Sequence, residues 1–292
     1  MAKTYLDDSR HGLGVLLILL SAFSFSCMSL FVAKSRGIHL FEQTFFRNLI
    51  GLLIAGAYCI RHHIPLFGQR KYQPQMFARS LFGFLAVVTI FYSSREANLA
   101  DMAIVLRTGM FTISLVSVLF LGEKLTRMHI PAMIIAFTGA WIAANPRFDS
   151  SILPLLAAFA SALCDTICYP MLSYFSGRVN PMSVVMHFCT VSTVLAGILM
   201  VPYFTVPTPV EWFYLILIGI SAAIGQITMT YAYKMAAAGE LSVYNQSQIV
   251  FNALLAVLFL QQAIEMRTVL GGFLVLLASL LLYLSKRRET SK

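Results

Sequence analysis

Few ionisable side chains interrupt the long apolar stretches of this sequence, and two arginines among them are suited to binding an anion. Arg47 and Arg107 each lie about two helical turns inside an apolar stretch, roughly 8–10 Å from its nearer end. An arginine at that depth is costly against lipid, and its planar guanidinium binds carboxylate or phosphate through paired hydrogen bonds. We expect at least one of them to face a cavity and bind an anionic group of a solute. The alternative is a structural ion pair with Glu42 or Asp165.

Two carboxylates accompany these arginines inside the apolar stretches. Asp165 lies near the middle of its stretch, where it suits a proton relay or a counter-ion to a cationic group, with pairing to an arginine as the structural alternative. Glu42, a further candidate solute contact, lies within a turn of the end of its stretch, where the alternatives are that it caps a helix or pairs with Arg47. Arg79 is close enough to an end for its charge to reach the membrane surface. The isolated His187 is expected to be a hydrogen-bonded packing residue.

An uncharged polar cluster occupies residues 244–248, Tyr-Asn-Gln-Ser-Gln. Such a run is costly against lipid and is expected to line the same cavity, with a hydrogen-bonded seam between helices as the alternative. Asn245 and Gln246 are its candidate solute contacts. Tyr92 and Tyr231 are candidate aromatic wall residues, or else members of an interfacial tyrosine belt. Cationic groups, one deep carboxylate, amides and aromatics together favour a zwitterionic or mixed-charge metabolite, such as an amino-acid derivative.

The elements that must position these residues are membrane-spanning helices. Of the 292 residues, 59% are hydrophobic and 11% are charged, and the mean hydropathy is +0.79. These values exclude a soluble globular domain and a disordered chain. Apolar stretches of about 20 residues, the length that spans a bilayer core, predict ten transmembrane helices. They run over residues 13–33, 41–60, 76–94, 102–121, 129–144, 152–174, 182–204, 212–233, 241–260 and 269–285. Residues 1–12 lack the features of a cleaved signal peptide, so the first helix is expected to be retained.

Basic residues are distributed unevenly between the loops. Of the 21 lysines and arginines, three lie inside the predicted helices and thirteen on the side shared by both termini. The remaining five, on the opposite side, are Lys34, Arg36, Arg95, Arg147 and Arg267. By the positive-inside rule, both termini are expected in the cytoplasm, with the chain in the cytoplasmic (inner) membrane. The net charge of +9 then reflects topology, and no nucleic-acid partner is expected.

The five cysteines all lie inside the predicted helices, without histidine or carboxylate neighbours arranged as metal ligands. Thiols in such surroundings are usually small packing side chains. We assign them no metal or redox chemistry, and no cofactor is expected.

An internal repeat relates the two halves of the chain. A shift of 139 residues aligns residues 91–144 with residues 230–283 without a gap. The pairs that meet include Tyr92 with Tyr231, Asp101 with Glu240 and Arg107 with Gln246. Because each half has five helices, the second copy enters the membrane from the opposite face, which is the inverted-topology repeat of many secondary transporters. The predicted fold is an all-α polytopic membrane protein with two inverted five-helix repeats, over 11–145 and 150–285, and a basic tail at 286–292.

Three stretches of the sequence resemble a known family: FEQTFFRNL at 41–49, NLADMAIVLRTGMFT at 98–112 and LFLGEKL at 119–125. They look like the EamA-type members of the drug/metabolite transporter superfamily, and the resemblance covers nearly the whole chain. It implies ten helices in two EamA repeats and the movement of small organic metabolites. The acidic residue five positions before Arg47, an arginine near the start of the third helix and Leu-Cys-Asp at 163–165 resemble the branch that contains bacterial S-adenosylmethionine uptake carriers.

The sequence departs from the family pattern at two places. Met110 stands where the family often has proline, so a proline-dependent kink is not predicted in the fourth helix. The second half reads Leu-Gln-Gln at 260–262 where the first half reads Leu-Gly-Glu at 121–123, so the halves need not contribute equally.

The expected function is secondary active transport by alternating access, without covalent chemistry, so the chain is not expected to be an enzyme. No GxxxxGK[ST] phosphate-binding loop occurs in the sequence, and a proton or an exchanged solute is expected to drive transport. Two alternatives remain open: a flippase or exporter for a lipid-linked or drug-like solute, and a membrane-embedded transferase, which would need clustered histidines or paired carboxylates. The expected partners are the solute, the coupling proton or exchanged solute, the bilayer and, as a possible homodimer, a second copy.

Overall fold

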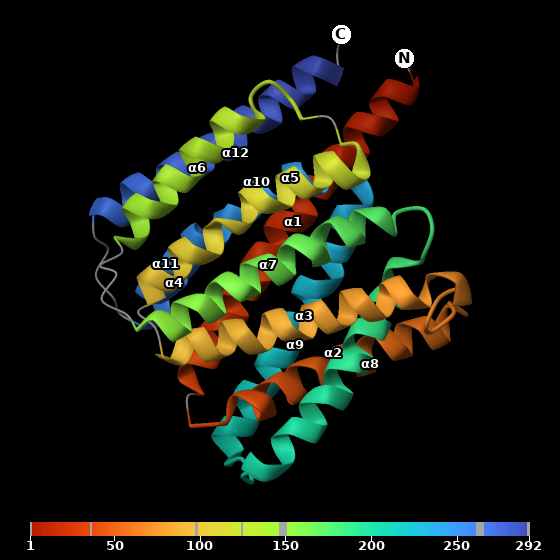
Figure 1. The fold of residues 1–292 in the computed structure, drawn as a ribbon, viewed down its shortest axis with the longest axis vertical. Coiled ribbons are helices and arrows are strands. Elements are labelled where there is room, and N and C mark those ends of the chain that lie inside the picture. The colour runs from red at the N-terminus through yellow and green to blue at the C-terminus, as the bar shows by residue number, and fades with distance from the viewer. Residues whose placement is uncertain are drawn as a thin grey trace.

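The computed structural model describes residues 2–35, 37–96, 99–123, 125–145, 151–260 and 266–290, and these form helices joined by short turns (Figure 1). In chain order the helices are α1 (Ala2–Lys34), α2 (Leu40–Arg61), η1 (Arg70–Tyr72), α3 (Gln73–Glu96), α4 (Leu99–Arg107), α5 (Gly109–Leu121), α6 (His129–Ala144), α7 (Ile152–Tyr174), α8 (Pro181–Met200), η2 (Val201–Tyr203), α9 (Pro209–Met235), α10 (Ala238–Tyr244), η3 (Asn245–Ser247), α11 (Gln248–Leu260) and α12 (Met266–Thr290). Those labelled η are single 3₁₀ turns.

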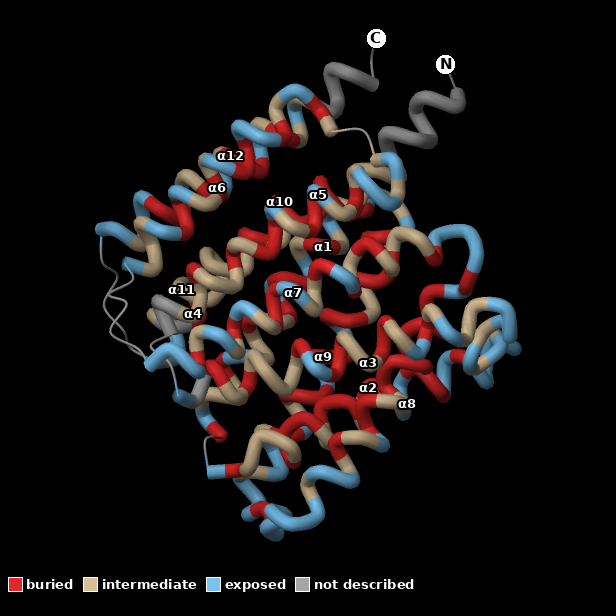
Figure 2. Tube along the Cα trace, viewed as in Figure 1, coloured by how far each residue is buried: buried red, intermediate tan, exposed pale blue. Residues whose placement is uncertain are grey.

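The described residues contain nine segments long and apolar enough to cross a membrane, together with α6, a shorter apolar helix of 16 residues. Large apolar side chains cover the outside of the bundle, including Leu16 at 61% exposure, Ile152 at 74% and Phe120 at 80%. Figure 2 shows this contrast between the exposed outer faces and the buried interior. Water would disfavour such a surface, whereas lipid tails accept it. The predicted all-α polytopic membrane fold is confirmed.

Local sequence determines several helix ends. The Asn180 side chain accepts the backbone N–H of Met182 and caps α8. Thr208 and Glu211 form a reciprocal capping box at the start of α9. Gly122, with φ of +65°, ends α5 in the left-handed conformation that glycine adopts without strain. These contacts satisfy backbone groups that a helix end leaves without partners.

Two helices that the sequence predicts as continuous, over 102–121 and 241–260, are each divided in the structure. Between α4 and α5, the N–H of Thr108 bonds the Val105 carbonyl and the N–H of Phe111 bonds the Thr108 carbonyl, at 3.2 and 3.1 Å. This three-residue spacing marks a 3₁₀ turn, which forms here without a proline. In the second half η3 occupies the corresponding place. A further difference is that α1 begins at Ala2, well before the predicted start at residue 13.

Helix packing in one half recurs in the other. α1 packs along α9, and α7 packs along α3 in the corresponding way; α2 packs on α8, and α6 on α12. The ends of the helices keep the register of the sequence repeat, because α5 and α11 begin and end 139 residues apart, as do the last residues of α3 and α9. The repeat seen in the sequence is therefore also a repeat of helix length and packing.

The α6–α12 pair at one edge of the bundle (Figure 1) packs unusually closely. A Cβ atom added to Gly139 would lie 2.6 Å from the Gly271 carbonyl oxygen, and one added to Gly271 would lie 2.5 Å from the Ala143 nitrogen. Only glycine allows two helix backbones to approach so closely, as at small-residue interfaces in membranes. The first turns of α1 and the last turns of α12 lie at the same end of the bundle (Figure 1).

Candidate solute-binding site

Two residues that the repeat pairs, Arg107 and Gln246, contact each other at the helix breaks. The Arg107 Nη1 atom donates to the Gln246 Oε1 atom at 3.2 Å. A residue that touches its own symmetry mate must lie near the axis that relates the two halves. Arg107 ends α4 and Gln246 lies in η3, so the two interrupted helices meet where both are broken. Discontinuous helices at such a place form the solute sites of many transporters.

Arg47 is buried at 5% exposure on α2, and its partners are neutral. Its Nη1 atom donates to the Asn48 Oδ1 atom at 2.8 Å, and its Nε atom approaches the Met28 sulfur at 3.5 Å. Its guanidinium carbon lies 5.9 Å from the centre of the Phe188 ring. A small cavity of about 10 Å³, room for about one water molecule, lies beside it. The cavity is lined by Arg47, Asn48, Gly51, Phe188, Cys189, Ala222, Ala223 and Gln226, from α2, α8 and α9.

Arg79 does not reach the membrane surface, so that expectation is wrong. It is 2% exposed, and its guanidinium carbon lies 4.4 Å from the centre of the Phe188 ring. Its Nε and Nη1 atoms have no hydrogen-bond partner among the described residues. The Phe188 ring therefore faces two guanidinium groups, from α2 and α3, which also lie within electrostatic range of each other. Cation–π attraction holds both cations inside the bundle.

Asp165 lies on α7 beside a tyrosine that the sequence analysis did not single out. Tyr169 follows one helical turn further along α7, with its hydroxyl beside the Asp165 carboxylate. The Tyr169 ring stacks on Tyr233 of α9, with 5.4 Å between ring centres. Tyr169 also lies within electrostatic range of Arg47, Arg79 and Arg107. Tyr169 therefore lies near both the deep carboxylate and the three buried arginines.

The three buried arginines have no carboxylate partner in the described part of the chain. Arg107 and Arg47 bond amide oxygens, two nitrogens of Arg79 bond nothing, and none forms an ion pair with Glu42 or Asp165. Asp165 is nevertheless within electrostatic range of Arg79. The interior thus carries more positive charge than its own carboxylates balance at contact distance.

Arg47, Arg79, Arg107, Asp165 and Tyr169 form the polar centre of the molecule. The other residues singled out in the sequence lie either near this centre or apart from it. Glu42 is fully buried in the first turn of α2. Asn245 is half-buried in η3, next to Gln246. Tyr92 is half-buried near the end of α3, and Tyr231 packs against a cluster that contains Phe188 and Cys59. The structure brings together Arg47, Arg107, Asp165 and Gln246 through Tyr169 and the helix breaks, but shows no contact between Tyr92 or Tyr231 and this group.

Several further side chains of this centre were missed in the sequence. Tyr169 follows Asp165 by four residues, the spacing that places two side chains on one face of a helix, and this signal was available. Asn48, Gln226 and Phe188 gave no such signal, because their importance depends on packing between α2, α8 and α9. His187, expected to be a packing residue, bonds the Ser80 hydroxyl at 2.8 Å.

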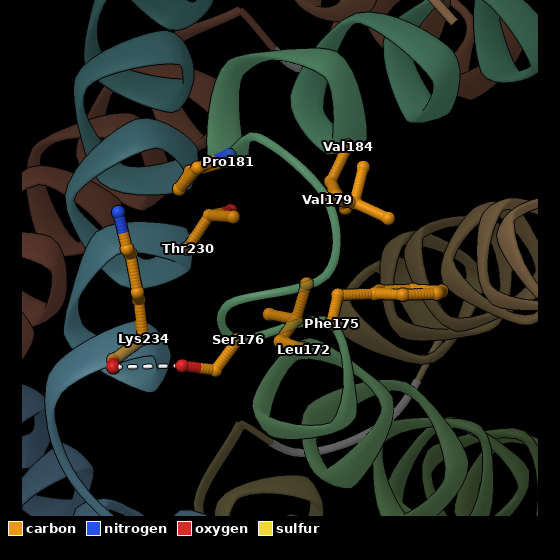
Figure 3. A pocket seen from close by; sticks show the side chains of 8 residues that line it. All are labelled: Leu172, Phe175, Ser176, Val179, Pro181, Val184, Thr230 and Lys234. Atoms are coloured by element: carbon orange, nitrogen blue, oxygen red, sulfur yellow. Dashed lines mark hydrogen bonds between the residues drawn. The ribbon is translucent and has the colours of Figure 1, made fainter. Parts of the chain in front are cut away.

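The cysteines are not paired with one another, and the second cavity lies apart from the buried arginines. All five cysteines are free thiols, and no group of potential metal ligands occurs among the described residues. The second cavity lies beneath the connection between α7 and α8, where the Ser176 hydroxyl donates to the Lys234 carbonyl at 2.9 Å (Figure 3). None of the buried arginines lines it. The side chains of Asp101 and of the Gln261 and Gln262 pair lie outside the described residues.

Comparison with known proteins supports a transport role. The EamA-like transporter family matches this chain twice, over residues 12–145 and 152–284. The pseudopaline exporter CntI of Pseudomonas aeruginosa is 30% identical over 277 residues, covering 94% of this chain and 97% of that protein. Solute carrier family 35 member G1 of Mus musculus is 25% identical, covering 92% and 77%. A riboflavin transporter of Rhizobium johnstonii is 28% identical over 190 residues, covering 63% and 62%.

The fold is likewise shared with a solved structure. That crystal structure is 20% identical in sequence and superposes with a TM-score of 0.82, covering 94% of this chain and 98% of the other. The family and these named relatives are transporters rather than enzymes. The match to the family spans both halves of the helix bundle, including the interrupted helices and the buried arginines. This multi-pass membrane protein therefore belongs to the EamA-like transporter family of the drug/metabolite transporter superfamily.

Proposed function

We propose that this transporter carries a small mixed-charge organic solute by alternating access, with the solute bound between the two halves. The observation that carries the proposal is the group of Arg47, Arg79 and Arg107, which are buried and bonded to neutral side chains or to none. A buried charge without a counter-charge is costly. An anionic group on the solute, a carboxylate or a phosphate, supplies that counter-charge and is bound in return.

The rest of the centre favours a second, positive group on the same solute. Asp165 and the Tyr169 hydroxyl offer acceptors for a cation, and the rings of Tyr169, Tyr233 and Phe188 offer faces for it. An amino-acid derivative meets these demands, and S-adenosylmethionine is the first one to test because of the resemblance in the sequence. The relative named as a pseudopaline exporter shows that export occurs among proteins similar to this one, so transport is to be measured in both directions.

The size of the cavity supports movement of the halves. At about 10 Å³, the space beside Arg47 has room for about one water molecule, far less than the roughly 300–1,000 Å³ of pockets that hold whole small molecules. In this conformation the site is therefore closed to a solute. Separation of the halves around the Arg107–Gln246 contact would enlarge it, as rocking of inverted repeats does in other carriers. The uneven loop charge supports a cytoplasmic membrane location with both termini inside.

The test is counterflow in liposomes that contain the purified protein. Labelled S-adenosylmethionine and a panel of amino acids are each compared with the corresponding carboxamide, which lacks the anionic group. We expect saturable exchange of the acid and little exchange of the carboxamide. Arg47→Gln and Arg107→Gln should each raise KM about 10- to 100-fold, the effect of losing a hydrogen bond between charged groups. Asp165→Asn should weaken binding of the positively charged compounds.

Arg178→Gln is the matched control, because Arg178 is exposed after α7 and bonds a backbone carbonyl. Its exchange kinetics should equal those of the wild type. Equal transport of acid and carboxamide, or unchanged KM in both arginine variants, would contradict the mixed-charge proposal. If no panel compound moves, movement of a fluorescent lipid between leaflets tests the flippase alternative.

A further inference from the structure

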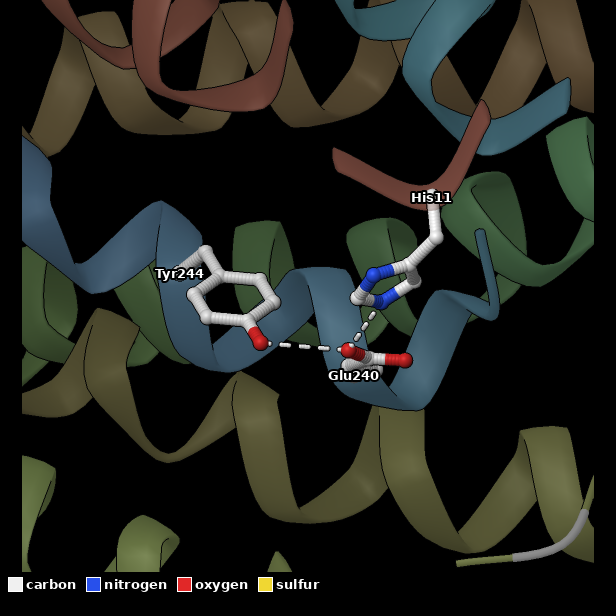
Figure 4. A network of polar contacts seen from close by, with 3 residues as sticks. All are labelled: His11, Glu240 and Tyr244. Carbon is white, nitrogen blue, oxygen red and sulfur yellow. Dashed lines mark hydrogen bonds and ion pairs between the residues drawn. The ribbon is translucent and has the colours of Figure 1, made fainter. Parts of the chain in front are cut away.

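A chain of three polar side chains ties the first helix to α10 (Figure 4). The His11 Nε2 atom lies 2.6 Å from a Glu240 carboxylate oxygen, and the Tyr244 hydroxyl donates to the same oxygen at 3.1 Å. Glu240 and Tyr244 are one helical turn apart on α10, so both face the start of α1. The three groups form one continuous hydrogen-bonded path.

The path leads from the surface of the bundle inward. The His11 side chain is 15% exposed, the Glu240 side chain is 6% exposed and Tyr244 is 1% exposed. Immediately after Tyr244 comes η3, where Gln246 meets Arg107. Water therefore has access to one end of the path, and the other end leads toward the centre where the solute is proposed to bind.

The path also joins the two halves of the molecule, since α1 belongs to the first half and α10 to the second. A second contact holds α10 from the first half at the same end. The Glu123 carboxylate accepts the backbone N–H groups of Ala238 and Gly239 at 2.9 and 3.1 Å, and so caps a helix that has no capping side chain of its own. The position of α10 thus depends on two carboxylates, and one of them is paired with a histidine.

His11 is the basic side chain that contacts Glu240 in the described part of the chain. Among the described residues, no lysine or arginine forms an ion pair with Glu240. The titratable groups that face the path from neighbouring elements are Tyr283 of α12, stacked on His11 at 6.0 Å, Glu123 after α5, and His129 of α6, which reaches α10 through Ser114. Histidine is the side chain that ordinarily changes charge near neutral pH.

We propose that the His11–Glu240 pair is the binding site for a proton whose gradient drives transport. The inference rests on the alternating-access function proposed above. The Glu240 carboxylate, bonded to His11 and accepting the Tyr244 hydroxyl, holds α10 against α1. A proton bound by the Glu240 carboxylate removes its negative charge, weakens the contact between the halves and frees α10 to move. The same proton leaves Glu240 when the halves have rocked, and the contact forms again.

The test separates exchange from accumulation. In liposomes, counterflow of labelled S-adenosylmethionine is measured at equal pH on both sides, and accumulation is measured under a pH gradient imposed in either direction. We expect Glu240→Gln, which binds no proton, to keep counterflow and lose gradient-driven accumulation. Arg178→Gln is again the control, because it leaves the whole path intact, and it should retain both activities.

A second readout needs no solute. Infrared difference spectra of the reconstituted protein between alkaline and acidic buffer should show the carbonyl band of a protonated carboxyl group. Glu240→Gln should lack that component. If Glu240→Gln does not fold, His11→Gln replaces it: this variant retains an N–H for Glu240 and should shift the pH at which the band appears.

Two transport results would overturn the proposal: wild-type accumulation by Glu240→Gln, and a wild-type protein that exchanges solute without responding to a pH gradient. An infrared band that is the same in the wild type and both variants would also overturn it. Absence of counterflow in the wild type would count against S-adenosylmethionine as the solute, and the infrared band would then decide the proton site independently.

Discussion

At the scale of single residues, the unusual feature is one aromatic ring shared by two buried cations. Arg47 and Arg79 come from different helices, and both guanidinium groups lie over Phe188. The two positive charges repel each other, and this repulsion is an unfavourable energy that attraction to the Phe188 ring partly offsets. An anionic solute group that entered the cavity beside Arg47 would relieve the repulsion. This arrangement favours binding of an anion over mere structural pairing.

Replacement of the ring should therefore destabilise the protein. We expect Phe188→Leu to lower the free energy of unfolding by about 2 kcal/mol, because desolvated cation–π contacts are lost. Phe120→Leu is the control, since Phe120 is 80% exposed on the outer face and takes no part in the contacts between Phe188 and the arginines. Its effect on the free energy of unfolding should stay within about 0.5 kcal/mol. Both are measured by denaturant titration in detergent. Equal effects of the two substitutions would show that the ring does not stabilise the arginines.

The two stacked tyrosines should respond differently to loss of their hydroxyl groups. The Tyr169 hydroxyl lies beside Asp165, whereas the buried Tyr233 hydroxyl has no partner among the described residues. Tyr169→Phe should raise KM for a positively charged solute about three- to tenfold, the effect of losing one hydroxyl that can accept a hydrogen bond from the solute. Tyr233→Phe should leave protein stability unchanged or increase it, because a hydroxyl without a partner is removed. Counterflow kinetics and denaturant titration measure these effects, and a larger transport defect in Tyr233→Phe would instead assign its hydroxyl to the solute.

At the scale of elements, helix ends set by neighbouring residues can be predicted from the sequence, and breaks set by packing cannot. α6 and α7 match the predicted 129–144 and 152–174. The turns at Thr108 and at η3 were not predicted, because a single 3₁₀ turn leaves the hydrophobic pattern intact. Their paired positions were nevertheless present in the 139-residue repeat. Arg79 looked close to a membrane edge, and its burial depends on Phe188 from another helix.

Some residues of the candidate site could likewise be predicted from the sequence, and others could not. Residue type and depth in an apolar stretch were enough to single out Arg47, Arg107 and Asp165, because charge inside a membrane is rare and costly. The sequence could not predict that neither arginine has a carboxylate partner, because this depends on distances between helices. Tyr169 could have been predicted from its helical spacing of four residues from Asp165, whereas Gln226 could not.

The close approach of α6 and α12 gives a prediction with a control one residue away. Gly271→Ala places a Cβ atom 2.5 Å from the Ala143 nitrogen, and Gly272→Ala places one no closer than 3.4 Å to Val250. The first substitution should lower the free energy of unfolding by about 1–3 kcal/mol through overpacking. The second should change it by no more than about 0.5 kcal/mol. Denaturant titration of both variants is the measurement, and a similar stability for the two would mean that α12 shifts without cost.

At the scale of the whole molecule, the halves match in packing and differ in their charged contacts. Glu123 holds α10 at one end, and the corresponding position in the second half is Gln262, which cannot supply a carboxylate. Arg107 likewise corresponds to Gln246. Because the two halves pack alike, the inward-open and outward-open conformations are expected to have similar packing. The side chains that differ between the halves then give the two conformations different energies. The preferred conformation of the free protein is then set by a few polar contacts and not by the core.

An exchange of side chains across the repeat tests this relation directly. Because Arg107 and Gln246 are related by the repeat and touch each other, exchanging them leaves one guanidinium and one amide at the centre of the molecule. Arg107→Gln alone should raise KM about 10- to 100-fold. The double variant R107Q/Q246R should recover most of that loss, as measured by counterflow. R107Q/Q226R restores the charge at a position without this relation and should not recover. If the exchanged variant transports no better than R107Q, the two positions are not equivalent, and the solute distinguishes the halves at their point of contact.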